Sequence, residues 1–374
     1  MAEPITQDRL RTLAELRPQQ GRVLSVFLNL DPTEFATPAA RASAITSVMT
    51  AAAHKIDHAE GLSHDERAAL RADLQRVRSA LEAWDLAANG TRAVAVYACG
   101  PADLLEVVAL RTPVESRVVL ERTPFVEPLV QEGPAERWLV VLSNRRIARF
   151  FAGQGHELEE TERLEDLVFS QQQQGGWSQA RYQRGVEKEK DDHLVNTADL
   201  AFKIYKRREV DRLLIGAPEE LVGELEDKLH PYLRERIAGR LRLDVENSSV
   251  EDVRKAAKEA IREHVRRCER EALDRLVAGV GRGGRGAAGL DEVLGALNEA
   301  RVDTLLIAAG FRAPGRIDRG TGMLHGESAP DGDRVEDIVE PAIEKALEQS
   351  ARTIVVRHHD DLGPLGGIGA VLRY

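Results

Sequence analysis

The sequence predicts a mixed α/β and α+β protein of three domains, residues 1–135, 136–262 and 263–374. Three observations support this fold class. The 374 residues suffice for two or three domains of ordinary size. A hydrophobic content of 43% with 30% charged residues is typical of a globular protein. Apolar runs of strand length alternate with longer stretches of helical periodicity, which indicates sheets covered by helices.

The first domain is expected to be α+β. Its predicted elements are a strand, two helices and three strands, over residues 22–30, 38–57, 63–87, 91–100, 104–110 and 116–130. Ser63 and Glu66 have the spacing of a capping box, in which each side chain bonds the backbone of the other residue. The Pro- and Gly-bearing segment 126–136 is expected to be the linker that leaves this domain.

The central domain begins with two strands in "RWLVVLSNRRIARFFAG", joined by a hairpin turn at Ser143-Asn144-Arg145. A third strand is expected over 157–167, followed by the polar segment 170–184. An amphipathic helix comes next, because apolar side chains recur at steps of four, three and four, at Leu194, Ala198, Ala201 and Tyr205. A buried strand "VDRLLIGAP", a helical region to about Gly239 and a strand "RLRLDV" complete the domain.

A long helix leads out of the central domain. Its predicted apolar stripe is continuous, through Val253, Ala257, Ile261, Val265, Cys268, Ala272 and Leu276. The third domain follows a glycine-rich linker, 279–289, and is expected to alternate helices with strands. Its predicted elements are a helix, a strand, a polar loop, a helix and two strands, over residues 290–300, 302–309, 310–333, 335–349, 352–359 and 369–374.

Composition limits the classes of function. A net charge of -10 argues against a protein that coats nucleic acid indiscriminately, although it permits a local basic patch. Cys99 and Cys268 are far apart and neither belongs to a CxxC, so neither a disulfide framework nor a cysteine zinc site is expected. The charged N-terminus and the lack of an apolar run of about 20 residues predict a cytoplasmic protein without a membrane span.

Three short motifs are better explained by structure than by chemistry. Gly279, Gly281 and Gly284 fit G-x-G-x-x-G, but a long helix precedes them where a dinucleotide site needs a strand. "VRHHDD" is interpreted as a solvated strand end, because neighbouring residues on a strand point to opposite faces. "EKEKDDH", from Glu187 to His193, has the mixed charges of a solvated helix face. No metal site and no cofactor are expected.

The segment "SQQQQGGWSQARYQR", residues 170–184, must be exposed, as a connector or as a functional loop. Gly175 and Gly176 permit close approach to another chain, and Trp177 is suited to stack on a base or ribose. The Gln179 amide can orient water but cannot take up a proton at neutral pH. Cations spaced three and four apart would form one basic stripe if a helix already begins there, at Arg181, Arg184 and Lys188.

The order of these units resembles the archaeal and eukaryotic class-1 peptide chain release factor superfamily. Its loop motif G-G-x-S-x-x-R-[FY]-x-R is matched by Gly175, Gly176, Ser178, Arg181, Tyr182 and Arg184. "GLDEVLGALNEARVDTLLI" is similar to the start of the C-terminal domain in that family, and "LGGIGAVLRY" is similar to its close in archaeal release factors and Pelota. The resemblance implies a central RNase H-like α/β domain with a protruding Gly-Gly loop. It also implies a C-terminal α/β/α sandwich like the kink-turn-binding ribosomal proteins.

The loop also departs from the family. Trp177 occupies the position of the family glutamine, and Gln179 lies two residues later. This GGxSQ form is similar to Vms-type peptidyl-tRNA hydrolases and their bacterial relatives, which include the hibernation factor Balon. The N-terminal domain lacks T-A-S-N-I-K-S, the stretch associated with stop-codon reading, so stop-codon decoding is not expected.

The resemblance implies a ribosome-associated release or rescue factor that hydrolyses the peptidyl-tRNA ester. Gly175, Gly176 and Gln179 would be the catalytic residues. The RNA-binding residues would be Trp177, Ser178, Arg181, Tyr182, Arg184 and Lys188. The expected partners are the ribosome, through ribosomal RNA and peptidyl-tRNA, and a translational GTPase such as elongation factor Tu. A non-catalytic factor that occupies the A site of idle ribosomes is the second hypothesis, and cleavage of tRNA near its 3′ end is the third.

Overall fold

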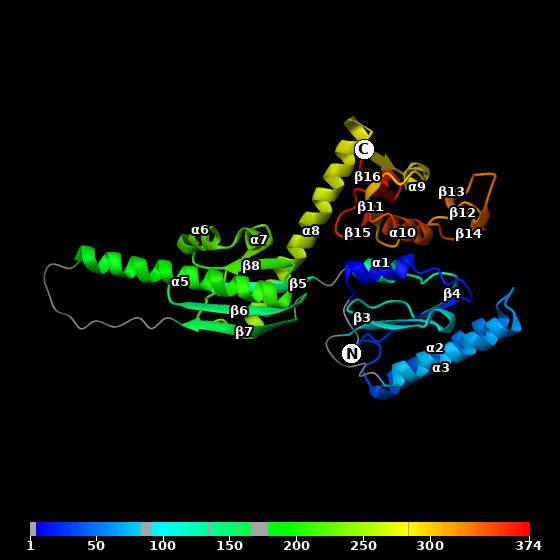
Figure 1. Ribbon diagram of the computed structural model, residues 1–374, viewed down its shortest axis with the longest axis horizontal. Helices are drawn as coiled ribbons and strands as arrows, with labels where there is room; N and C mark the ends of the chain where they lie inside the picture. The colour runs from blue at the N-terminus through cyan, green and yellow to red at the C-terminus, as the bar shows by residue number, and fades with distance from the viewer. Residues whose placement is uncertain (1–4, 84–90, 134–135, 156, 166–178, 283) are drawn as a thin grey trace. The chain divides into compact units, whose positions relative to one another are not determined.

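The computed structural model describes residues 5–83, 91–133, 136–155, 157–165, 179–282 and 284–374 (Figure 1). They form two compact units. The outer unit joins Met1–Pro134 with Glu269–Tyr374, and the central unit is Ala135–Cys268. The several sheets, each with helices packed on it, confirm the mixed α/β fold class, whereas the domain boundaries at 135/136 and 262/263 stay a prediction.

The N-terminal part of the outer unit is built on an antiparallel sheet of order β3-β2-β1-β4. Its elements are α1 Gln7–Glu15, β1 Val23–Asn29, α2 Pro38–His58, α3 His64–Ala83, β2 Ala93–Cys99, β3 Leu104–Leu110 and β4 Arg117–Glu121. Alternate side chains of β1 separate to the two faces, and Leu24, Val26 and Leu28 pack against α2 and α3. The capping box is confirmed: the Ser63 backbone N–H donates to Glu66 Oε2 over 2.8 Å, and the Glu66 N–H donates to Ser63 Oγ over 3.1 Å.

The C-terminal part of the outer unit is an α/β/α sandwich, as predicted. Its sheet has the order β10-β16-β11-β15. Helices α9 and α10 pack on one face, and the last turns of the long helix α8 pack on the other. The elements are α8 Val250–Arg282, β10 Gly286–Ala288, α9 Leu290–Asn298, β11 Val302–Ala308, α10 Val339–Glu348, β15 Arg352–Val356 and β16 Ile368–Leu372.

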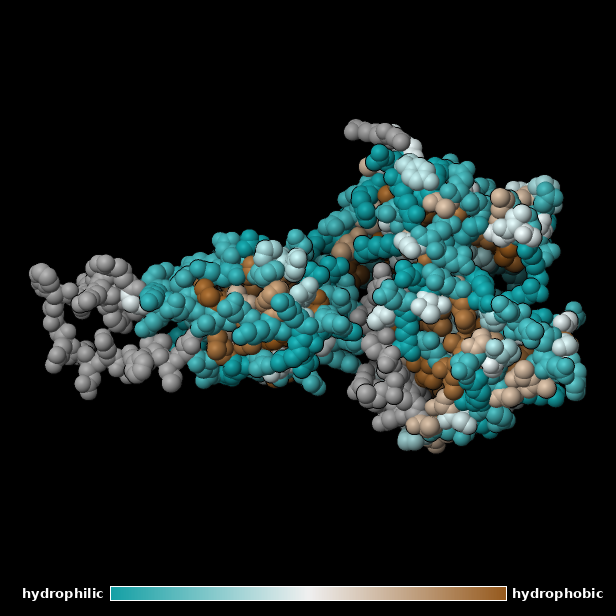
Figure 2. Space-filling model, in the orientation of Figure 1, coloured by the Kyte–Doolittle hydropathy of each residue, from teal (hydrophilic) through white to brown (hydrophobic). Residues whose placement is uncertain are grey.

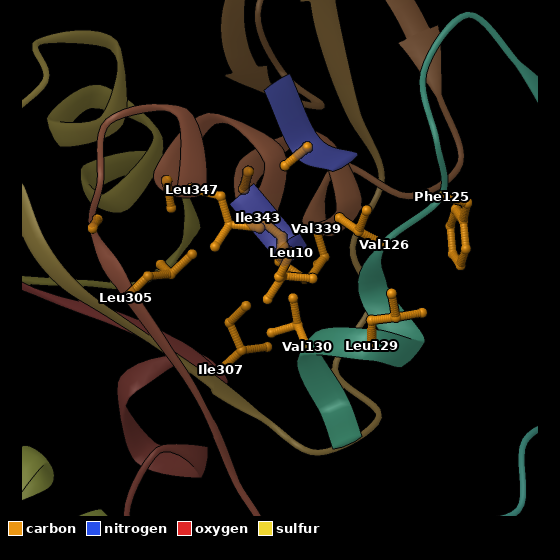
Figure 3. Close-up of a cluster of buried hydrophobic side chains, with 14 of the residues drawn as sticks. Leu10, Phe125, Val126, Leu129, Val130, Leu305, Ile307, Val339, Ile343 and Leu347 are labelled. Atoms are coloured by element: carbon orange, nitrogen blue, oxygen red, sulfur yellow. The ribbon is translucent and has the colours of Figure 1, made fainter. Parts of the chain in front are cut away.

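The segment 126–136 was expected to be an exit linker, and the predicted strand 116–130 was expected to run into it. The strand is confirmed only over Arg117–Glu121, and helix α4, Glu127–Glu132, lies where the rest of the strand and the linker were expected. Pro128 lies in its first turn, where a proline is tolerated. Figure 3 shows Val126, Leu129 and Val130 pointing into an apolar core with side chains of α1, β11 and α10.

A buried carboxylate holds α4 in this core. Glu340 of α10 is 5% exposed and accepts hydrogen bonds from the backbone N–H groups of Val126 (2.5 Å) and Glu127 (2.9 Å). Burial raises the pKa of Glu340 well above its usual range. One turn later, Glu344 accepts from Thr123 Oγ1 over 2.7 Å and lies 3.2 Å from Arg17 Nη2. Segments more than 200 residues apart in the chain are therefore joined by specific polar contacts as well as by apolar packing.

Two further expectations for the C-terminal part need correction. The polar loop 310–333 contains most of a three-stranded antiparallel sheet of order β13-β12-β14. Its strands are β12 Gly315–Asp318, β13 Met323–Gly326 and β14 Asp333–Val335, too short and polar to give a clear alternating pattern. The glycine-rich segment 279–289 is the end of α8 followed by β10 and not a linker. A Cβ atom on Gly286 would lie 2.5 Å from the Val280 nitrogen, so glycine permits this close backbone packing.

The segment "VRHHDD" follows the end of β15 and is mostly exposed, as expected, but α8 also binds it. Glu269 is 3% exposed, and its Oε2 accepts from the backbone N–H of His358 over 3.0 Å while its Oε1 lies 2.9 Å from His358 Nδ1. Arg270 forms two hydrogen bonds of 3.0 Å to the Asp361 carboxylate. These contacts fix the chain that leaves β15 against α8.

The central unit contains a five-stranded sheet of order β7-β6-β5-β8-β9. An antiparallel meander, β5 to β7, is extended on its other side by two parallel strands, as expected of an RNase H-like domain. Helices α5, α6 and α7 cover one face and the first turns of α8 cover the other. The elements are β5 Arg137–Ser143, β6 Ile147–Gln154, β7 Glu157–Glu165, α5 Gln179–Arg208, β8 Arg212–Gly216, α6 Glu219–Lys228, α7 Pro231–Arg234 and β9 Ile237–Leu241. The predicted hairpin is confirmed, since Asn144 Oδ1 accepts from the backbone of Arg146 and Ile147.

A buried ion pair closes the α8 side of the central sheet. Arg149 of β6 is 4% exposed and forms two hydrogen bonds, of 2.9 and 2.7 Å, to the Glu160 carboxylate of β7. Its Nη1 also donates to the carbonyls of Val245 and Ser248, which precede α8. The pair raises the pKa of Arg149 and lowers the pKa of Glu160.

The apolar stripe of α8 is not continuous, contrary to expectation. Val253 and Ala257 are buried in the central unit, and Ala272 and Leu276 are buried in the outer unit. Between them Val265 is 39% exposed. The first turns of the helix therefore pack in the core of the central unit, and its last turns pack in the core of the outer unit. No described helix has the length and apolar composition that a bilayer crossing requires.

Glu344→Gln should make the stability of the outer unit less dependent on pH. Burial raises the pKa of Glu344 to about 7, whereas an unfolded glutamate titrates near about 4.3. Between these values the folded protein keeps a proton that the unfolded chain releases, so stability is highest below about pH 4.3 and falls as pH rises to about 7. Thermal unfolding at about pH 5 and about pH 8 should show a loss of up to about 3 kcal/mol in the parent and a smaller loss in the variant. An equal loss of stability in the parent and in the variant would contradict a raised pKa of Glu344.

Arg149→Ala should lower the free energy of unfolding of the central unit by about 3 kcal/mol or more, because Glu160 then loses its partner in a shielded position. Urea unfolding followed by Trp138 fluorescence would measure this loss. The matched control is Arg163→Ala, which removes an exposed pair with Glu165 and should cost less than about 1 kcal/mol. A similar small cost for both variants would refute the structural role of Arg149.

Candidate functional site

The candidate site is the segment between β7 and α5. Strand β7 ends at Glu165, and α5 begins at Gln179, directly after the sequence GGWS. Residues 166–178 lie outside the described part of the chain, so the predicted site residues Gly175, Gly176, Trp177 and Ser178 have no structural account. The described chain on either side of these residues is β7 and α5.

One face of α5 is buried from Lys190 onward. The core against the sheet includes Leu194, Ala198, Ala201 and Ile204, each at most 3% exposed. The amphipathic prediction is thereby confirmed for its first three positions, while Tyr205 is only partly buried. We call residues 190–208 the anchor, because they are the part of the helix that packs on the sheet. They form the second part of this 30-residue helix.

Charged side chains fix the start of the anchor to α6. Lys190 is 8% exposed, its Nζ lies 2.7 Å from Glu224 Oε2, and it also pairs with Glu187. These carboxylates, Glu187 first, raise the pKa of Lys190. One residue on, Asp191 Oδ1 lies 2.5 Å from Lys228 Nζ. The two ion pairs to α6 resist rotation of α5 about its axis.

His193 completes the anchor on the sheet side. It is 1% exposed, and its Nε2 lies 3.4 Å from the hydroxyl of Ser143 at the end of β5. Its backbone carbonyl accepts from Thr197 Oγ1 over 2.8 Å. The expectation that "EKEKDDH" is a solvated face is therefore wrong for Lys190 and His193. The charge pattern could not reveal this, because the partners come from α6 and β5.

The first turns of α5 project beyond the sheet, as Figure 1 shows. Gly185, Glu187, Lys188 and Glu189 are exposed. At a rise of about 1.5 Å per residue, the helix extends about 16 Å from Lys190 to Gln179. In Figure 2 the visible surface along α5 is mostly hydrophilic. Gln179 is thus the first residue of a projecting helix.

The remaining predicted site residues lie within α5. Gln179, Arg181, Tyr182 and Arg184 belong to its backbone, although their side chains are outside the described set, and Lys188 is exposed. A basic stripe through residues 181, 184 and 188 requires that these residues belong to one helix. The backbone meets this requirement, because the helix begins at Gln179. The stripe itself and the assigned roles stay predictions.

Such an arrangement suits catalysis that depends on the position and orientation of the reacting groups. A rigid helix can deliver the Gln179 amide and neighbouring backbone groups to a distant substrate, without a side chain that takes up protons at neutral pH. Sequence reasoning missed Lys190, Glu224, Asp191, Lys228 and His193, the residues that set the direction of the helix. Their spacing along the chain gives no signal of the contacts between α5, α6 and β5.

Parts of this chain are similar to known proteins. Residues 124–262 match the family model described as bacterial archaeo-eukaryotic release factor family 10. A protein pelota homolog of Natronomonas pharaonis is 36% identical over 110 residues, 28% of this chain and 27% of that protein. The solved Pelota of Archaeoglobus fulgidus is 17% identical, with 75% of this chain and 79% of that chain covered and a TM-score of 0.34. An archaeal translation termination factor is also 17% identical, with 99% of each chain covered and a TM-score of 0.27.

The matched region spans most of the central unit and both flanks of the 166–178 segment. It defines a release-factor-like domain. In this region the chain is similar to the bacterial branch of the archaeal and eukaryotic release factor superfamily, the resemblance that the sequence predicted. The family model that it matches is family 10 of that branch.

Lys190→Ala should loosen the projecting turns of α5, because Glu187 and Glu224 lose their shared cation. Hydrogen exchange with mass spectrometry should show amides of residues 185–192 exchanging about 5-fold faster or more. Lys188→Ala, at an exposed position on the same helix, should leave this exchange unchanged. Unaltered exchange in the Lys190 variant would show that the ion pairs do not anchor the helix.

Proposed function

We propose that this protein is a ribosome-associated translation release or rescue factor that hydrolyses the peptidyl-tRNA ester with Gly175, Gly176 and Gln179. The observation that carries the proposal is that Gln179, the last residue of GGWSQ in the sequence, begins α5 about 16 Å before the anchored part of that helix. The match of residues 124–262 to release factor family 10 supports it. The ribosome, through ribosomal RNA and peptidyl-tRNA, is the proposed partner, with a translational GTPase such as elongation factor Tu.

In this mechanism the Gln179 amide orients a water molecule toward the ester carbonyl carbon. The Gly176 backbone N–H stabilises the oxyanion that develops as water adds. Rate enhancement comes mainly from positioning and from polar groups of the ribosomal RNA, since the amide does not act as a base. Trp177, Ser178 and Tyr182 contact RNA, and Arg181, Arg184 and Lys188 bind phosphates.

Trp177 favours a second candidate function. It stands where the family carries glutamine, and an indole ring suits stacking on RNA better than it suits orienting water. A non-catalytic factor that occupies the A site of idle ribosomes would bind vacant ribosomes tightly and release no peptide. Release and binding measured on the same preparation separate the two functions.

Gln179→Ala should slow single-turnover peptide release from stalled ribosomes by about 100-fold, because the attacking water loses its orientation. Gln171→Ala changes a glutamine of the same segment outside GGWSQ and should release peptide at the parent rate. Ribosome binding, measured by co-sedimentation, should be unchanged in both. Equal release by the parent and the Gln179 variant would remove Gln179 from the mechanism, and no release by the parent would favour the A-site-occupying function.

A further inference from the structure

A set of stacked aromatic rings lies at the end of α5 remote from Gln179. We call it the aromatic platform, and it consists of Phe202, Tyr205, His230 and Tyr232. The Phe202 and His230 rings are stacked, with centroids 3.9 Å apart and an interplanar angle of 11°. Tyr205 lies nearly parallel to Phe202 at 5.8 Å. Phe202 and Tyr205 also pack on the core of the central unit, which gives the platform a rigid base.

Tyr232 is the accessible ring of the platform. It is 56% exposed, and its ring is tilted by 54° from that of His230, with centroids 4.9 Å apart. Its backbone is fixed on both sides: the Tyr232 N–H donates to His230 Nδ1 over 3.3 Å, and its carbonyl accepts from Arg236 Nη1 over 2.9 Å. A large apolar ring is thus held in water at a fixed position, where it stabilises no core.

Two cations lie over rings of the platform, and three cations that are unpaired within the described part of the chain lie in the last turns of α5. Lys206 Nζ lies 4.4 Å from the centroid of Phe202, and the Arg236 guanidinium carbon lies 5.1 Å from the centroid of Tyr205. Among the described residues, Lys203, Lys206 and Arg208 have no ion-pair partner, whereas Arg207 is paired with Glu162. In a chain of net charge -10, such a group of unneutralised cations favours a polyanionic ligand.

We propose that the aromatic platform and its cations bind single-stranded RNA, with an unpaired base on Tyr232 and the backbone phosphates on Lys203, Lys206 and Arg208. Exposed aromatic rings beside cations are the combination that single strands require, because each base offers a face and each linkage a negative charge. An acidic protein segment would use the cations but leave the Tyr232 ring uncovered. Double-stranded RNA would offer phosphates but no free base face.

This contact is distinct from the GGWSQ segment. Phe202 lies about 35 Å along the helix from Gln179, at about 1.5 Å per residue. One continuous helix would therefore join two RNA contacts, one at each end. The inference rests on the rings and charges of the platform. It does not depend on whether the protein releases peptide.

The test is fluorescence anisotropy of the full chain with a labelled oligouridine of about 12 nucleotides. Tyr232→Ala should weaken binding by about 5-fold or more, and Tyr232→Phe, which keeps the ring, should bind within about 2-fold of the parent. Lys206→Ala should reduce the slope of log affinity against log salt concentration by about 0.7. Tyr374→Ala removes a ring that is 69% exposed in the outer unit and should have no effect.

Three results would overturn the proposal. Tyr232→Ala could bind oligouridine as tightly as the parent. Duplex RNA of the same length could bind as tightly as the single strand, which would assign the surface to phosphates alone. Oligoglutamate of equal charge could compete as well as unlabelled oligouridine, which would assign it to an acidic protein segment. Circular dichroism of each variant excludes misfolding, which is not expected at so exposed a ring.

Discussion

The central unit depends on the burial of one face of α5 from Lys190 onward. The hydrophobic effect holds Leu194, Ala198 and Ala201 against the sheet. Because this effect is not directional, it does not by itself fix the rotation of the helix about its axis. The ion pairs of Lys190 and Asp191 with α6 and the contact of His193 with Ser143 add direction. Because that part of the helix is held, its first turns can extend into solvent in a defined orientation. The proposed release chemistry and the proposed RNA platform both use this rigidity, at opposite ends of the same helix.

The outer unit shows the same combination of apolar packing with a few directional polar contacts. Its core joins α1 and α4 to β11 and α10, segments from the two ends of the chain. Glu340 is costly to bury, and its raised pKa records that cost. Its hydrogen bonds to two backbone N–H groups fix where α4 begins against α10. Apolar contacts alone would allow the short helix to shift along this surface.

Electrostatics are compatible with the proposed RNA partner of this acidic chain. A net charge of -10 disfavours indiscriminate binding to polyanions, so affinity must come from local groups of cations with defined geometry. The last turns of α5 supply one such group, and the predicted stripe through Arg181, Arg184 and Lys188 would supply another. A protein of this kind would recognise a site by shape and position, with phosphate contacts setting its register.

The sequence by itself determined the fold class, most of the strands and helices, the Ser63–Glu66 capping box, the Asn144 turn and the resemblance to release factors. Local periodicity and turn chemistry carry that information, because they depend on residues a few positions apart. Tertiary structure alone decided that 126–136 is a buried helix, that 310–333 carries a small sheet, and that Lys190 and His193 are buried. It also brought Phe202 of α5 against His230, 28 positions later. Each of these outcomes depends on a partner from a distant segment, and a partner that is remote along the chain leaves no periodic signal in the sequence.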